Sequence, residues 1–151
     1  MAQVTRQQIE HMLNTVGQDG LSLAKQNLMG IDLSHLDLSG VRMQEANFQG
    51  ANLSHTNLSG AFLVDANFKD ANLSYADLSD AYISKVNFSG ANLTHASLED
   101  AKADEAKFEQ ADLQDARLTG TSLRAANFTC ARLRCTPRMA TCSRGESPLR
   151  A

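Results

Sequence analysis

The sequence predicts an all-β solenoid, a quadrilateral parallel β-helix that coils around a narrow apolar column behind a short N-terminal capping helix. Two regularities predict this fold. Residues 21–135 divide into 23 in-phase pentads without insertion or deletion. Five of the six phenylalanines recur every twenty residues within those pentads. We therefore expect one short strand and one corner from each pentad, and four pentads in each coil.

The first regularity is the pattern inside the pentad. Its third residue is Leu, Phe, Met or Ile everywhere except at Ala103, its first is mostly Ala, and its second is often Asn or Asp. A spacing of five turns about 140° around a helix, which would scatter the apolar residues over the whole cylinder. In a strand, positions one and three point inward and position two points outward. The fifth residue, often Gly, then makes the corner.

The second regularity gives the number of pentads in a coil. All five recurring phenylalanines occupy third positions, so a coil of four pentads would stack them on one side of the column. The predicted core ladder is Phe48, Phe68, Phe88, Phe108 and Phe128. Another side contains Ala103, where we expect a thin place in the core.

Residues 1–20 predict a helical cap for the first coil, because a solenoid exposes unpaired backbone at its ends. Thr5 and Gln8 fit a capping box, and Gly17 is a stop signal, which predicts a helix over residues 6–16. An apolar stripe would lie on the first coil, and a membrane-surface or partner helix is the alternative. The stripe consists of Ile9, Met12, Leu13 and Val16.

The C-terminal end has no comparable signal. Pro137 and Arg138 break the register, and residues 136–151 show no periodicity, so we expect a disordered tail. The last coil would then be uncapped. We predict that it pairs with a second copy, giving a homodimer, or with a partner protein.

Composition narrows the class of protein. The chain has 151 residues, a net charge of −3 and no apolar run long enough to span a membrane, which favours a cytoplasmic protein and does not favour direct nucleic-acid binding. Cys130, Cys135 and Cys142 match no zinc signature and make no disulfide framework, so we expect thiols.

The pentads "ANLSH", "ADLSD", "ANLTH" and "ADLQD" fit the pattern A-(D/N)-L-x-x. Over residues 21–135 the chain resembles the pentapeptide repeat family, which implies a right-handed quadrilateral β-helix. The helical cap is similar to that of small cyanobacterial members. Some members resemble B-form DNA, bind DNA gyrase and confer quinolone resistance. Those members are acidic along the rod and dimerise through C-terminal elements, whereas this chain has an Arg-rich end and no helical C-terminal pattern.

Charge is distributed unevenly near the C-terminal end. Residues 99–115 contain seven acids against two lysines, and residues 116–145 contain six arginines and no acid. Opposed patches of this kind steer and orient association, so we predict a docking surface here, with a merely solvated surface as the alternative. The predicted interaction residues are Glu99, Asp100, Asp104, Glu105, Glu109, Asp112, Asp115, Arg117, Arg124, Arg132 and Arg134.

One series of corner residues also recurs every twenty positions. It consists of His35, His55, Tyr75, His95, Asp115 and Cys135. Rungs about 4.8 Å apart would let neighbouring imidazoles share a metal ion or bind a planar ligand. Ordinary solvated corners are the alternative reading.

These features predict a non-catalytic interaction or scaffold protein without a cofactor or a dedicated metal site. The many outward serines have neither a neighbouring base nor a pocket, which argues against an enzyme. Two alternatives stay open: a DNA mimic that acts on gyrase, and weak metal or ligand binding along the His/Tyr edge.

Overall fold

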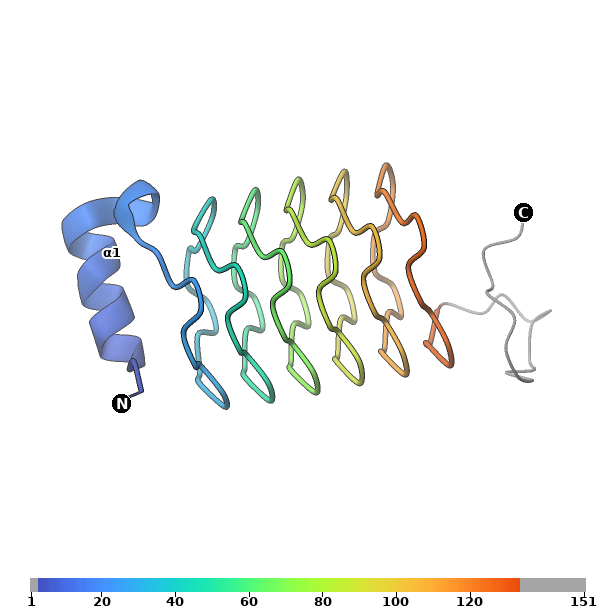
Figure 1. The fold of residues 1–151 in the computed structure, drawn as a ribbon, viewed down its shortest axis with the longest axis horizontal. Coiled ribbons are helices and arrows are strands. Elements are labelled where there is room, and N and C mark those ends of the chain that lie inside the picture. The colour runs from blue at the N-terminus through green and yellow to red at the C-terminus, as the bar shows by residue number, and fades with distance from the viewer. Residues whose placement is uncertain (1–2, 134–151) are drawn as a thin grey trace.

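The computed structural model describes residues 3–133, which form one helix followed by a four-sided solenoid (Figure 1). Helix α1 spans Arg6–Gly20. Beyond it, every β-bridge is parallel and joins residue i to residue i+20, from Ser22↔Arg42 to Asp112↔Arg132. This offset confirms four pentads in each coil. The strands are shorter than a conventional strand, because only the second residue of each pentad forms a bridge.

The pentad geometry is as predicted. In the pentad Ala51–His55, the first and third residues are buried and His55 occupies the corner, with a φ of 58°. The N–H of Thr56 donates to the carbonyl of Leu53 (3.2 Å), which closes the turn. Every fifth position from Lys25 to Cys130 has a positive φ, whether or not it is Gly. The corners therefore hold sixteen non-Gly residues in a region that side chains other than Gly rarely adopt.

The second residue of the pentad caps the turn that follows it. Asn52 Oδ1 accepts a hydrogen bond from the N–H of Ser54 (3.2 Å), and the same contact recurs at most Asn and Asp second positions. Asparagines also bond along the rod, as when Asn72 Nδ2 donates to Asn52 Oδ1 (3.3 Å). These bonds explain why the repeat prefers Asn or Asp at an outward position.

The predicted Phe ladder is confirmed. The rings of Phe48 and its successors stack inside the rod with centroid separations of 4.7, 5.4, 5.2 and 4.8 Å. Ala103 is fully buried in another column. The column of rings thus fixes the four-pentad register, since a slip of one pentad would place Phe against Leu.

Hydrogen bonds between coils have a direction. Leu53 and His55 donate their N–H groups to the carbonyls of Asn72 and Ser74 in the following coil (2.7 and 3.0 Å). Only the second residue donates the other way, as Asn72 does to Ala51 (2.9 Å). Each pentad therefore presents two carbonyls and one N–H toward the N-terminal end. Toward the C-terminal end it presents two N–H groups and one carbonyl.

Helix α1 begins as predicted and ends later. Thr5 is the N-cap and forms a capping box with Gln8. Gly17 (φ 68°, ψ −179°) breaks the helical conformation as expected, but a further turn continues to Gly20 and leads the chain into the first coil. The predicted stripe is wrong at Val16, which is 55% exposed. Ile9 is fully buried, and Met12 and Leu13 pack against the core.

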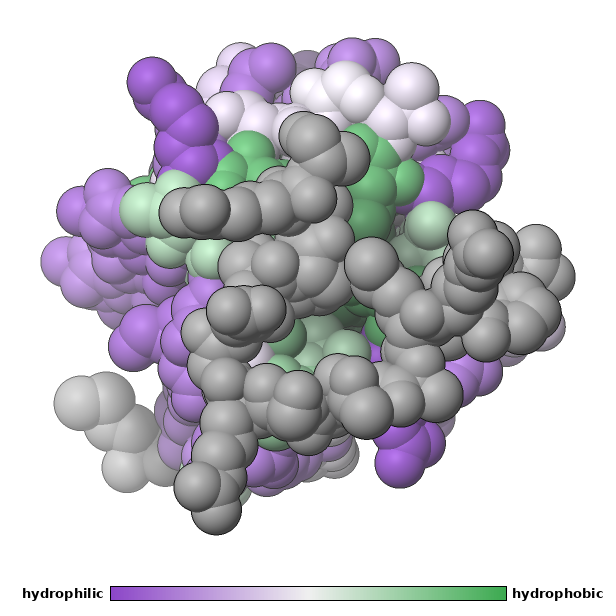
Figure 2. Space-filling view, turned by 90° about the vertical axis from the view of Figure 1, so that its right-hand side faces the viewer, coloured by the Kyte–Doolittle hydropathy of each residue, from purple (hydrophilic) through white to green (hydrophobic). Residues whose placement is uncertain are grey.

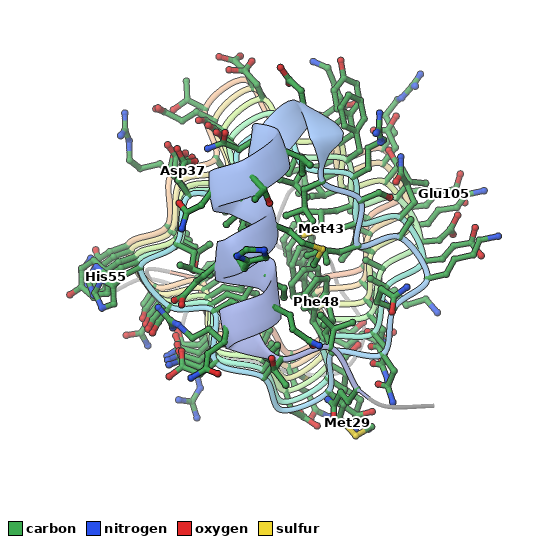
Figure 3. The ribbon with its side chains drawn as sticks, turned by 90° about the vertical axis from the view of Figure 1, so that its left-hand side faces the viewer. Met29, Asp37, Met43, Phe48, His55 and Glu105 are labelled. Carbon is green, nitrogen blue, oxygen red and sulfur yellow. The ribbon has the colours of Figure 1, made fainter. Side chains whose placement is uncertain are left out.

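The helix also satisfies the carbonyl-rich edge beneath it, which it crosses in Figure 3. Gln3 Nε2 donates to the carbonyl of Met29 (2.8 Å). The guanidinium of Arg6 donates to the carbonyls of Ser34 (3.1 Å) and Asp32 (3.4 Å). The cap therefore supplies both apolar cover and the donors that this edge requires.

The last coil is less buried than those before it. Leu118, Leu123 and Leu133 are only partly buried, and apolar side chains are visible inside the polar outline of this end in Figure 2. Residues 134–151 lie outside the described part of the chain. The predicted tail therefore stays a prediction.

Candidate functional site

One side of the solenoid departs from the repeat. We call it the aromatic face: the side formed by the pentads that start at residues 21, 41, 61, 81, 101 and 121. On the other three sides the second position is mostly Asn or Asp, but on the aromatic face it never is. The second positions here are Ser22, Arg42, Phe62, Tyr82, Lys102 and Ser122.

Phe62 and Tyr82 stack on the outside of this face. Their ring centroids are 4.9 Å apart with an interplanar angle of 6°, and the two residues are 38% and 45% exposed. Because the rings lie face to face along the rod axis, they offer their edges and the Tyr82 hydroxyl to solvent. Arg42 and Lys102 occupy the rungs on either side.

The aromatic face gives up hydrogen bonds that the other sides make. Phe62 and Tyr82 have no side-chain oxygen placed to accept from the fourth residue of their pentads. Within residues 3–133, no acceptor is found for the N–H groups of Val64 and Ser84. An outward Asn would provide one. The fold alone therefore does not explain two aromatic residues at these positions.

The predicted acidic band and the arginines are brought together by the coil spacing. Each described arginine that follows residues 99–115 pairs with an acid of the preceding coil. The pairs are Arg117–Glu99 (2.7 Å), Arg124–Asp104 (2.9 Å) and Arg132–Asp112 (3.8 Å). Much of the predicted docking charge is thus used to hold the last coil against its neighbour. Arg134 lies outside the described residues.

Asp104 is the best-bonded member of this group. It accepts hydrogen bonds from Ser122 Oγ (2.5 Å) and from the backbone N–H, Nε and Nη2 of Arg124 (3.1, 3.1 and 2.9 Å). The bond from Ser122 and then those from Arg124 lower the pKa of Asp104 from 3.8 to about 2. Its offset of twenty from Arg124 was the sequence signal that could have predicted this pairing.

The remaining acids of the band are distributed around the rod. Asp100, Glu105 and Asp115 lie at three different corners, and Glu109 accepts from Asn127 Nδ2 on another side (2.7 Å). The band therefore encircles one coil instead of following the rod axis. A surrogate for the DNA backbone would need acids along the axis.

The His/Tyr edge forms a continuous stack. His35, His55, Tyr75 and His95 have successive centroid separations of 4.9, 4.8 and 4.7 Å, with interplanar angles of 11° or less. His55 projects away from the rod in Figure 3, on the side away from the Glu105 corner. The predicted spacing is confirmed, and the three histidines are exposed.

The hollows on the surface are shallow and polar. Two of them meet at Gly90, between Asp70 and Gln110. The described residues contain no group of three or more His, Cys, Asp or Glu placed to hold a metal ion. Within the same part of the chain, no helix is long and apolar enough to cross a membrane. Cys130 is exposed, and Cys135 and Cys142 are outside the described residues.

Comparison with solved structures gives the same fold. A pentapeptide repeat protein from the cyanobacterium Cyanothece 51142 is 24% identical with a TM-score of 0.74, over 81% of this chain and 95% of that one. Another, from Nostoc PCC 7120, is 24% identical with a TM-score of 0.62, over 89% and 99%. A third, from the thylakoid lumen of Arabidopsis thaliana, is 35% identical with a TM-score of 0.52, over 69% and 66%.

Comparison at the sequence level agrees with the structural one. No curated protein matches the chain. A family model described as pentapeptide repeats matches residues 27–63, 61–100 and 104–136. These segments cover most of the solenoid, and the chain therefore belongs to the pentapeptide repeat family.

Proposed function

We propose that this protein is a non-catalytic interaction module that docks a polypeptide partner on its aromatic face. The observation that carries the proposal is the exposed Phe62–Tyr82 pair. Each ring occupies the position of an Asn that caps the turn on the other sides. The turn-capping hydrogen bond is therefore absent at these two positions, and two aromatic rings are exposed to solvent. Exposed aromatic residues at the centre of a patch are typical of interaction hot spots.

The surroundings of the pair indicate the chemistry of the partner. Arg42 and Lys102 lie three rungs apart, about 14 Å along the rod at 4.8 Å per rung. Four residues of an extended peptide span about 13 Å. A strand that runs along the rod would therefore place two carboxylates on the cations and an apolar side chain between them, on the ring edges.

The stacking of Phe62 on Tyr82 favours a peptide partner over a single-stranded nucleic acid. The faces of Phe62 and Tyr82 that point toward each other are covered, so bases cannot stack between them. Acids lie near both cations in the sequence: Glu45 is in the pentad of Arg42, and Asp100 lies two residues before Lys102. Two cations in such surroundings suit two carboxylates better than a continuous phosphate backbone.

The test replaces both aromatic residues by Asn, the residue that is common at second positions on the other three sides. In a Phe62→Asn/Tyr82→Asn double variant, the second positions regain the residue that caps the turn on the other sides, so we expect unchanged or slightly higher stability. Peptides are selected from a random display library on the immobilised full chain. We expect peptides with an apolar residue midway between acids four positions apart, and at least about tenfold weaker binding to the double variant.

The matched control lies at the second position on the opposite side of the same coil. Asn72→Ser removes a turn cap and leaves the aromatic face intact, so it should bind the selected peptides like the wild type. Equal binding to the double variant would refute the docking surface. Selection of peptides without acids would refute the assigned partner chemistry alone.

A further inference from the structure

The His/Tyr edge keeps ring side chains where the backbone disfavours them. His35, His55, Tyr75 and His95 have φ values of 62°, 58°, 58° and 58°. A residue other than Gly pays a conformational cost at such a corner. None of the rings contributes to the core, and Tyr75 is 53% exposed. Stacking accounts for flat rings at these positions, but it does not require imidazole.

Two of these imidazoles occupy neighbouring rungs. The His35 and His55 rings are parallel within 6° with centroids 4.9 Å apart. Zn–N bonds of about 2.0–2.1 Å in a tetrahedral site bring two ligand nitrogens to about 3.4 Å. Each Zn–N bond lies in the plane of its ring, so both rings must turn out of their parallel stack for their nitrogens to point at one ion. Both side chains are exposed, which leaves room for that turn. Tyr75, on the next rung, is not one of the residue types that usually bind zinc.

We infer that His35 and His55 form a binding site for a divalent transition-metal ion such as Zn²⁺, with water completing the tetrahedral coordination. Neutral imidazole is a preferred ligand of these ions.

The charge around this pair does not oppose a cation. The outward neighbours of the two rings in their own pentads are Asp32, Ser34, Asn52 and Ser54. Arg6 is the basic group that reaches this region, through the carbonyl of Ser34. Its charge is matched by Glu10 at 2.7 Å and Asp32 at 3.4 Å. The site lies away from the aromatic face, so its failure would leave the proposed docking function untouched.

The experiment is a Zn²⁺ titration of the full chain, followed by NMR of the histidine ring nitrogens. We expect saturable shifts of His35 and His55 together, while His11 and His95 serve as internal controls. His55→Asn should weaken binding at least about tenfold, whereas His95→Asn should not change it. Asn tolerates the corner conformation, so both variants should fold.

A gain-of-function variant sharpens the test. Tyr75→His places a third imidazole beside His55, and we expect about tenfold tighter Zn²⁺ binding. The inference fails if all four histidines shift together over the same Zn²⁺ range, which is adventitious binding. It also fails if His55→Asn binds like the wild type, or if Tyr75→His gives no gain.

Discussion

The two ends of the solenoid are stabilised in different ways. At the N-terminal end, Ile9 is fully buried and Gln3 and Arg6 donate hydrogen bonds to the carbonyls of the first coil. At the C-terminal end, the last described coil is held by ion pairs to the coil before it, with Asp104–Arg124 the best bonded. Helix α1 covers the N-terminal end, whereas side-chain contacts with the preceding coil hold the last described coil.

The difference follows from the direction of the ladder. The N-terminal edge presents twice as many carbonyls as N–H groups, so its cap must donate. The C-terminal edge has the opposite excess, and a matching cap must accept. Two C-terminal ends placed together would set N–H groups against N–H groups. The predicted homodimer through this end stays a prediction, and it would depend on side chains more than on backbone pairing.

The largest loss of stability should come from truncating a core side chain midway between the two ends. Phe88→Ala removes a ring stacked between Phe68 and Phe108, and we expect a loss of about 3–5 kcal/mol in the free energy of unfolding. Phe128→Ala, in the last coil, should cost less and loosen that coil alone. Urea unfolding and hydrogen exchange measure the two effects. Equal losses would show that the C-terminal end is as cooperative as the middle.

The next effect tests the apolar part of the N-terminal cap. Ile9→Ala should lower the free energy of unfolding by about 2–4 kcal/mol, because Ile9 is fully buried against the first coil. Val16→Ala, on the same helix but exposed, is the control and should change stability by less than about 0.5 kcal/mol. If the two variants unfold alike, the cap does not stabilise the rod by burial.

A smaller effect tests the donors of the cap. Arg6→Ala removes the hydrogen bonds to the carbonyls of Ser34 and Asp32, and we expect a loss of about 1 kcal/mol in thermal or urea unfolding. Arg6→Lys keeps the charge but not the forked geometry, so it should recover only part of the loss. Full recovery by Lys would mean that charge, and not donor geometry, is what matters.

The smallest expected effect is a difference between the two ends in how their stability depends on pH. The pKa of Asp104 is lowered to about 2, so its contribution is complete above its ordinary value of 3.8 and is lost as the pH falls through about 2. Hydrogen bonds from Ser34, and then the positive charge of Arg6, also lower the pKa of Asp32 in the first coil. With α1 covering that coil, we expect the last coil to loosen first in acid.

Backbone NMR between about pH 5 and pH 2 follows this loosening residue by residue. Asp104→Asn should remove most of the pH dependence around Ser122 and Arg124. Earlier loosening of the first coil would reverse the proposed order of the two ends.

The sequence predicted the solenoid, the Phe ladder, the corners at the fifth residues and the start of α1, because each depends on local or periodic constraints. It did not predict that Asn52 and its equivalents cap turns, although Asn and Asp commonly accept a hydrogen bond from the backbone N–H two residues on. The aromatic face was missed although Phe62 was expected to point outward. Comparing second positions twenty residues apart would have shown that one side of four lacks Asn and Asp. The pairing of Asp104 with Arg124 was missed because acids and arginines were read as separate blocks.

The bridging of residue i to residue i+20 also restricts how this chain can change length. Inserting five residues would turn everything downstream by a quarter of a coil, set Phe88 over a Leu column and break every side-chain stack that crosses the insertion. Duplicating twenty residues would instead add one rung of about 4.8 Å and leave all columns aligned. Evolution and engineering can therefore lengthen or shorten the rod only in whole coils, and each added coil would carry a second residue of its own onto the aromatic face.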